Sequence, residues 1–177
     1  RISKSPAVFD YKKLDWFNGE YIKLKTDEEF EKLAEPYIKS VMGKNFGCAL
    51  KISNLLKGRI SKLSEIPELI GFFAKLPSCD VNIFINKKSK TTLENSKAVL
   101  EEIKPKLEKL SVWNYDSLHD LLINFAKEKE LKNGTVMWPV RIAISGSVVT
   151  PGGAIEILDI LGKEESLKRI DFALSIL

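Results

Sequence analysis

Histidine is nearly absent from this 177-residue chain, and no long apolar run occurs in it. The single histidine, His119, is too little for a His-centred triad or for a metal site with several histidines. Its neighbours predict a surface position on the polar side of a helix. No apolar stretch approaches the roughly 20 residues that span a bilayer, and residues 1–10 lack the apolar core of a signal peptide. We therefore expect no membrane partner and no export.

Cysteine is also scarce. Cys48 and Cys79 lie far apart and form no Cys-x-x-Cys pair, so a reduced, cytoplasmic protein is the simplest interpretation. The composition is 44% hydrophobic and 29% charged, which excludes wholesale disorder. A net charge of +4 and an isoelectric point near 8.9 permit a polyanionic partner without requiring one.

Apolar residues at three- and four-residue steps predict helices along most of the chain. Near its start we expect Leu14, Phe17 and Tyr21 to face inward, with Trp16 packed inside the first unit. Thr26–Glu29 has the capping-box pattern, in which the first and last side chains each accept a free backbone N–H at a helix start.

Later helix boundaries are predicted from capping residues and glycine. Thr91–Glu94 reads as a second capping box, and Asp116-Ser117 is expected to cap the next helix. Asn133-Gly134 is expected to supply the left-handed turn that ends that helix. Thr150-Pro151 reads as an N-cap followed by proline at the first helical position, and Gly162 ends the helix that follows.

Two segments are ambiguous. Val81–Ile85 alternates as a short strand would, although so short a run cannot settle the period. The β-branched residues of Val136–Ile144 favour a buried strand, yet the same apolar run also fits a buried helix. The sum is an all-α protein in two packed helical units. They are separated by a stretch that begins at Pro77 and includes the basic residues Lys87, Lys88 and Lys90, which gives units of residues 1–86 and 87–177.

The segment Arg1–Ser5 resembles the Lys-Met-Ser-Lys-Ser loop with which class I aminoacyl-tRNA synthetases stabilise ATP phosphates. That loop works only beside a nucleotide-binding fold, and nothing lies upstream of it here, so we interpret the match as a coincidence of spelling. Because the first residue is not methionine, we expect a piece of a longer protein. No nucleophile–base pair, metal cluster or phosphate loop is present, which disfavours an autonomous enzyme.

Several ordered blocks resemble one known family. They are Ser5–Asp10, Lys13–Ile22, Leu55–Ile66, Lys87–Thr92, Gly134–Gly146, Thr150–Ile157 and Leu161–Leu167. Together they closely resemble the C-terminal anticodon-binding region of bacterial-type glutamyl-tRNA synthetases, over most of the chain. The resemblance implies that the second unit is an α-helical cage and that Val136–Ile144 is helical.

The resemblance also implies a function. The chain would recognise the anticodon of glutamate tRNA, as part of a parent enzyme that ligates glutamate to tRNA with ATP and Mg. We expect this fragment to hold no cofactor, to be inactive alone, to be monomeric and to have no DNA partner. The alternative is a helical protein-interaction module of a synthetase.

The same resemblance assigns candidate RNA-binding residues. Arg141 matches an arginine that contacts anticodon bases, since a guanidinium can pair with base edges and stack on a splayed base; the alternative is a cation that holds a helix end or a carboxylate. Thr150, Pro151 and Gly152 match a loop that opens a helix against the anticodon, or form an ordinary capped helix start. Gly153 stands where some members carry a larger apolar residue that packs on a base.

Further candidates are basic or aromatic. Arg59 matches an arginine that recognises an anticodon nucleotide, the alternative being a solvated basic face with Lys57 and Lys62. Trp113 is expected near a helix start. Trp138 is the best candidate among the tryptophans for partial exposure near RNA, although its sequence favours core packing. Possible phosphate contacts, or otherwise parts of a solvated linker, are Lys87, Lys88 and Lys90.

Overall fold

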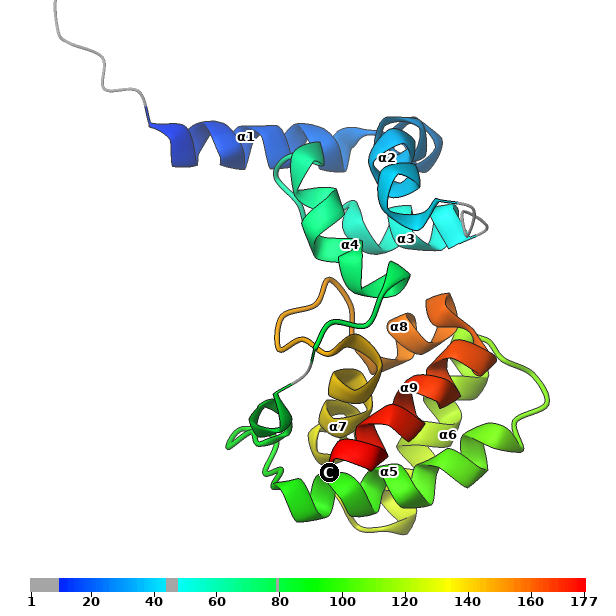
Figure 1. Cartoon of the computed structure of the whole chain (residues 1–177). Helices are drawn as coiled ribbons and strands as arrows, with labels where there is room; N and C mark the ends of the chain where they lie inside the picture. Colours follow the sequence, from blue (N-terminus) through cyan, green and yellow to red (C-terminus); the bar gives the residue numbers. More distant parts are fainter. Residues whose placement is uncertain (1–9, 44–47, 79) are drawn as a thin grey trace, which may run out of the picture. The chain divides into compact units, whose positions relative to one another are not determined.

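The computed structural model describes residues 10–43, 48–78 and 80–177 (Figure 1). Over these ranges the chain forms α-helices and short 3-10 helices and no strand, which confirms the all-α class. The predictions made for Arg1–Ser5 and for Cys79 lie outside the described residues. The chain divides into two compact units, Arg1–Glu68 and Leu69–Leu177. This division falls within α4 (Ile66–Ala74), before the boundary at residue 86 that the sequence suggests. The boundary at residue 86 stays a prediction about where one binding unit ends and the next begins.

The first unit is built around α2. Its elements are α1 (Tyr11–Leu24), α2 (Asp27–Met42), α3 (Ala49–Leu56) and the 3-10 helix η2 (Leu63–Glu65). The predicted capping box is confirmed, because Thr26 Oγ1 accepts the Glu29 N–H at 3.2 Å and the Glu29 carboxylate accepts the Thr26 N–H at 3.1 Å. Helix α2 continues through Pro36, and Phe30, Ala34 and Ile38 are buried along one face of it.

Helix α1 buries a different face from the predicted one. Leu14, Phe17 and Tyr21 are 49%, 44% and 67% exposed, and Trp16 is 59% exposed, so their predicted inward packing is wrong. The helix is formed as its period predicts, but its buried residues are Gly19 and Ile22. A Cβ at Gly19 would lie 3.6 Å from the Ile60 carbonyl oxygen, an ordinary contact distance, so Gly19 lies on the face that packs against that segment.

The second unit surrounds a buried helix. Its elements after α4 are η3 (Val81–Phe84), α5 (Leu93–Glu108), α6 (Tyr115–Glu128), α7 (Asn133–Ser145), α8 (Ala154–Leu161) and α9 (Lys163–Ile176) (Figure 1). Helix α7 contacts α5, α6, α8, α9 and η3. Val136, Val140 and Ile144 are fully buried on it, so burial on most sides overrides their β propensity. The helix that the resemblance implied over Val136–Ile144 is confirmed.

Local predictions around α5 need correction. Val81–Phe84 is a 3-10 helix capped by Asp80, so the strand suggested by its alternation is wrong. The second capping box is real but begins at Thr92, which pairs with Asn95 instead of the predicted Thr91 and Glu94. Thr91 is unavailable because its hydroxyl donates to the Phe84 carbonyl at 2.7 Å.

The ends of α6 and α8 also differ from the predictions. Asn114 caps α6 by accepting the Ser117 N–H, so the cap lies just before the predicted Asp116-Ser117 cap. The left-handed residue after α6 is Glu130, with φ of 54°, and Asn133 instead begins α7. Helix α8 begins at Ala154, not after Thr150, while Gly162 ends it as predicted.

Predictions for His119 and Trp113 are confirmed. The His119 side chain is 45% exposed on α6. Trp113 directly precedes the N-cap of α6, and its indole N–H donates to the Leu158 carbonyl at 2.9 Å.

A buried cation ties two helix ends of this unit together. Arg169 on α9 is 2% exposed, and its guanidinium donates to the Phe72 and Ile144 carbonyls at 2.7 and 2.8 Å. It also donates to the Phe73 carbonyl at 3.2 Å and pairs with the Glu165 carboxylate at 2.7 Å. Because the last carbonyls of a helix have no intrahelical partner, Arg169 satisfies the C-terminal ends of α4 and α7.

Candidate nucleic-acid interface

One face of α7 opens onto a hollow in the second unit. The helix places Gly134, Met137, Trp138 and Arg141 on that face, because they follow i, i+3, i+4 and i+7 spacing. The hollow has a volume of about 400 Å³. Its remaining lining residues come from the segments before α5, before α7 and at the start of α8, and are Lys88, Ser89, Lys132, Gly153 and Ala154.

The Arg141 guanidinium is held in a fixed place at this hollow. Its Cζ lies 4.6 Å from the centroid of the Trp138 ring, and its Nη2 donates to the Val148 carbonyl at 3.1 Å. The ring is itself held, since the Trp138 indole N–H donates to the Ile83 carbonyl at 3.0 Å. Burial lowers the pKa of Arg141, but a guanidinium remains charged at neutral pH. The site therefore presents a pre-oriented cation stacked on an aromatic plane.

The lysine-rich stretch forms a closed turn beside α7. Asn86 and Thr91 exchange both backbone hydrogen bonds across Lys87–Lys90, at 3.2 and 3.0 Å. The Thr135 hydroxyl donates to the Ser89 carbonyl at 2.8 Å, which ties this turn to the first turn of α7. Lys88 therefore reaches the hollow, whereas Lys87 and Lys90 do not line it.

The segment before α8 contributes less to the hollow than its sequence suggests. Gly153 lines it and donates its N–H to the Glu156 carboxylate at 3.1 Å. Pro151 and Gly152 are buried, and the Thr150 hydroxyl donates to the Gly152 carbonyl at 2.7 Å. The structure thus brings together Arg141, Gly153 and Lys88 of the predicted set, while RNA contacts by residues 150–152 stay a prediction.

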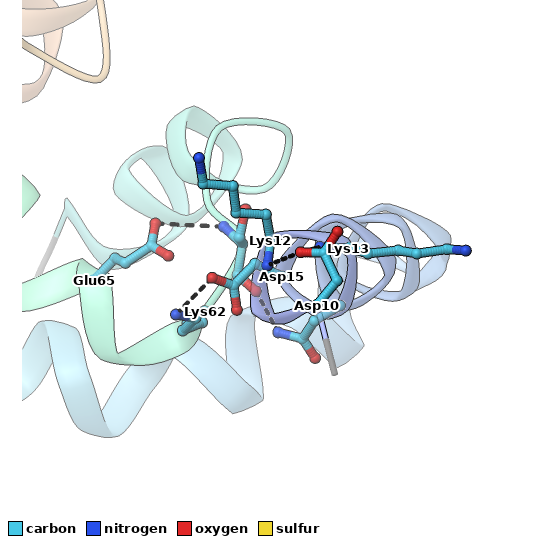
Figure 2. A network of polar contacts seen from close by, with 8 residues as sticks. Asp10, Lys12, Lys13, Asp15, Lys62 and Glu65 are labelled. Atoms are coloured by element: carbon cyan, nitrogen blue, oxygen red, sulfur yellow. Dashed lines mark hydrogen bonds and ion pairs between the residues drawn. The ribbon is translucent and has the colours of Figure 1, made fainter. Parts of the chain in front are cut away.

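Arg59 lies in the first unit, where it is exposed and donates to the Leu55 carbonyl at 2.5 Å. Its neighbouring lysines are paired with acids: Lys57 with Asp27 at 2.6 Å, and Lys62 with Asp15 at 2.9 Å (Figure 2). A hydrogen bond from Lys62 to the Asp15 carboxylate raises the pKa of Lys62. The positive charge of the two lysines beside Arg59 is therefore partly neutralised. The role of Arg59 in RNA binding stays a prediction.

Sequence reasoning missed several residues of the hollow. Lys132 was passed over because Asn133-Gly134 read as the turn ending a helix, whereas it begins one. Once a helix is accepted there, the spacing of Gly134, Met137, Trp138 and Arg141 identifies one face and would have found the missing wall. Trp138 is partly exposed, so the core packing that the sequence favours for it is incomplete. No local signal marks Ser89, because only the fold brings it to α7.

Within residues 10–43, 48–78 and 80–177, no group of three or more His, Cys, Asp or Glu side chains is placed to hold a metal ion. In the same ranges, no helix combines the length and the apolar character needed to cross a membrane.

Known proteins resemble this chain over nearly its whole length. The family model for an anticodon binding domain matches residues 22–174. The glutamate–tRNA ligase of Clostridium kluyveri is 53% identical over 98% of this chain, and that of Clostridium tetani is 53% identical over 96%. A solved glutamate tRNA ligase from Elizabethkingia meningosepticum, in complex with its amino acid, is 25% identical with a TM-score of 0.81 over 99% of this chain. The chain spans 35%, 34% and 34% of the lengths of these proteins.

Proposed function

The chain belongs to the anticodon-binding domain family, and on that premise we propose that it recognises the anticodon loop of glutamate tRNA. The family match and the ligase names of its relatives support this proposal. The chain covers only about a third of those relatives. The ligation of glutamate to tRNA with ATP and Mg is therefore proposed for the whole enzyme only. For this part of it, we propose that the chain binds tRNA as a monomer in the cytoplasm.

One observation carries the proposal, namely the Arg141 guanidinium stacked on Trp138 at the wall of a hollow. Among the described residues, the guanidinium donates one hydrogen bond, to the Val148 carbonyl, so several of its donors remain for a ligand. A fork of donors beside an aromatic plane suits an unstacked base, whose edge takes hydrogen bonds while its face stacks. Further contacts to the RNA are proposed for Thr150, Pro151, Gly152 and Gly153 in the second unit and for Arg59 in the first.

A second candidate function has its own supporting observation. Helix α1 exposes large apolar side chains, including Tyr11 at 73% and Leu24 at 79%. A helix with such a face is typical of a surface that docks another polypeptide. Under this alternative the chain is a helical protein-interaction module, and Arg141 has no part in its affinity.

The experiment compares glutamate tRNA with a variant that carries another anticodon in the same tRNA body. We expect the wild-type chain to bind glutamate tRNA more tightly in a gel-shift titration, with a micromolar or weaker dissociation constant because contacts to the rest of the tRNA are missing. Arg141→Ala should weaken binding and remove most of the discrimination. The control is Lys109→Ala, an exposed cation at the C-cap of α5. Equal wild-type affinity for both tRNAs overturns the proposal, and unchanged binding by Arg141→Ala favours the interaction module.

A further inference from the structure

We propose that Arg169 is a positioning residue for RNA recognition, and that it acts through Arg141 by fixing the C-terminal end of α7 against the end of α4. This inference rests on the proposed function, because it takes Arg141 to be a residue that contacts the RNA. Arg169 itself lies outside the hollow, since it is not one of the residues that line it. The contacts that carry the inference all lie within the second unit.

Arg169 is set apart from the other cations of the chain by its burial. Among the residues that the structure describes, it is the one charged side chain that is buried. Its Nη1 donates to the Phe72 and Ile144 carbonyls, and its Nη2 donates to the Phe73 carbonyl. Burying a guanidinium is costly unless its donors are paired. Because these donors form a rigid planar fork, they fix the three carbonyls relative to one another.

A second contact joins the same two helix ends. Gly146 is the C-cap of α7, where the chain turns away from the helix with φ of 63°. A Cβ at Gly146 would lie 2.9 Å from Pro77 Cγ and 3.2 Å from the Pro77 carbonyl oxygen, so the glycine packs directly against Pro77. Pro77 follows shortly after the end of α4. The point at which the chain leaves α7 is therefore held by Arg169 and by the segment after α4.

The turn that starts at Gly146 holds the Arg141 side chain. The buried Ser145 hydroxyl donates to the Arg141 carbonyl at 2.7 Å and accepts the Ser147 N–H at 3.2 Å. The Arg141 Nη2 in turn donates to the Val148 carbonyl at 3.1 Å. The turn and the guanidinium thus form one connected network, in which the position of the Val148 carbonyl determines where the guanidinium is held.

A displacement at the end of α7 would reach Arg141 through this network. The Ile144 carbonyl lies in the last turn of α7, where carbonyls have no partner within the helix. Without the Arg169 guanidinium this end can shift, and the Val148 carbonyl shifts with it. Because a binding group must be held in its productive geometry by the contacts around it, the loss should appear in RNA recognition as well as in stability.

The RNA-binding experiment uses two anticodon-arm hairpins, one with a glutamate anticodon and one with a swapped anticodon. Arg169→Lys keeps the charge but replaces the planar fork of donors by a compact ammonium. Its affinity for the glutamate hairpin should fall about 3- to 30-fold, as expected for groups coupled in one network, and discrimination between the hairpins should fall with it. In the Arg141→Ala background, Arg169→Lys should have no further effect on affinity.

The Arg141 side chain can also be followed without RNA. Its Nε–H signal in a ¹⁵N NMR spectrum is assigned by its absence from the spectrum of Arg141→Ala. Arg169→Lys should shift or broaden this signal, because the guanidinium is no longer held in one place. A substitution that only lowers stability would leave the signal of the folded protein unchanged.

Two controls separate positioning from stability. Glu165→Gln removes the ion pair with Arg169 Nε but leaves the three carbonyl contacts, so it should bind both hairpins as the wild type does. Leu118→Ala removes a fully buried side chain of α6 that does not line the hollow, so its folded form should bind with wild-type affinity. If circular dichroism shows that Arg169→Lys does not fold, Pro77→Ala takes its place, because it removes the ring that contacts Gly146 at an exposed position.

The outcomes separate the two claims. Equal wild-type affinity for both hairpins overturns the proposed function. If the wild type discriminates between them, wild-type binding by Arg169→Lys overturns the inference alone. The inference is likewise overturned by an equal loss of affinity in the wild-type and Arg141→Ala backgrounds, or by an unchanged Arg141 signal.

Discussion

The Thr135 hydroxyl donates to the Ser89 carbonyl at 2.8 Å, across 46 residues of sequence. This bond joins the first turn of α7 to the turn that carries Lys88. The two sides of the hollow are therefore joined, and the bond holds the turn that carries Lys88 beside the helix that carries Arg141 and Trp138. Contacts of this kind let a small helical unit hold several polar groups in one arrangement.

Thr135→Val tests this coupling. The substitution keeps the shape of the buried side chain but leaves the Ser89 carbonyl without its donor, so we expect a loss of about 1 kcal/mol of stability by urea denaturation. Affinity for an anticodon-arm hairpin of glutamate tRNA should fall, because the turn formed by Lys87–Lys90 is no longer held against α7. Ser96→Ala is the control, because it removes another buried hydroxyl, one that lies on α5. This variant should lower stability, but the folded protein should bind the hairpin with wild-type affinity. Equal affinity of Thr135→Val and wild type would contradict the coupling.

Trp138 is expected to act through Arg141. Trp138→Leu removes the aromatic plane under the guanidinium, and a cation–π contact contributes about 0.5–2 kcal/mol. Affinity for the hairpin that carries the glutamate anticodon should therefore fall by about 2- to 30-fold. The discrimination between this hairpin and one with a swapped anticodon should fall in parallel.

Trp113 provides the control for Trp138. Its indole N–H also donates to a main-chain carbonyl, that of Leu158, but Trp113 does not line the hollow. Trp113→Phe and Trp138→Phe each lose one such hydrogen bond and should lose similar stability, about 1 kcal/mol. Only the Trp138 variant should lose affinity for the anticodon-arm hairpin of glutamate tRNA, as measured by a fluorescence-anisotropy titration. A matching loss of affinity in the Trp113 variant would show that the effect is structural.

Gly146 and Gly162 both have positive φ but lie in different backbone regions. Gly146, the C-cap of α7, has φ of 63° and ψ of 16°, the left-handed helical region, where alanine costs about 1–2 kcal/mol. Gly162, the C-cap of α8, has φ of 78° and ψ of 171°, a region essentially restricted to glycine, where strain costs about 1–3 kcal/mol. A Cβ at Gly146 would also lie 2.9 Å from Pro77 Cγ, whereas nothing lies within 4 Å of one at Gly162. Gly146→Ala should therefore lose more stability in urea denaturation than the about 1–2 kcal/mol of its backbone strain alone. A loss within about 1–2 kcal/mol would mean that the Pro77 contact relaxes without cost.

The helices could largely be predicted from sequence, because apolar spacing and capping residues are local signals. Their packed faces were less predictable. The apolar steps of α1 predict its period, yet the residues that α1 buries are Gly19 and Ile22, and Gly19 faces a segment distant in sequence. Similarly, Thr91 has the side chain of a cap but spends its hydroxyl on the Phe84 carbonyl, so the cap moves to Thr92.

The candidate site was predictable where a family motif marks it and unpredictable where only tertiary contacts make it. Arg141 and Gly153, which the family motif singles out, both line the hollow. Ser89 and Lys132 belong to it because Thr135 bonds the lysine turn, a contact between segments that no local pattern reveals. Val136–Ile144 shows the opposite case, since its β-branched residues suggested a strand until burial on several sides made it a helix.

Arg169 should be among the most sensitive positions for stability, although it is far from typical of a core residue. Its guanidinium satisfies the carbonyls of Phe72, Phe73 and Ile144, so Arg169→Met would leave buried acceptors without donors. Breaking a buried charged network of this kind costs about 3–5 kcal/mol. The neighbouring exposed Lys168→Met on α9 should change stability by less than about 0.5 kcal/mol, which separates the effect of position from that of the introduced side chain. Urea denaturation followed by circular dichroism measures both variants. A loss below about 1 kcal/mol in Arg169→Met would mean that water or a rearranged helix end replaces the lost donors.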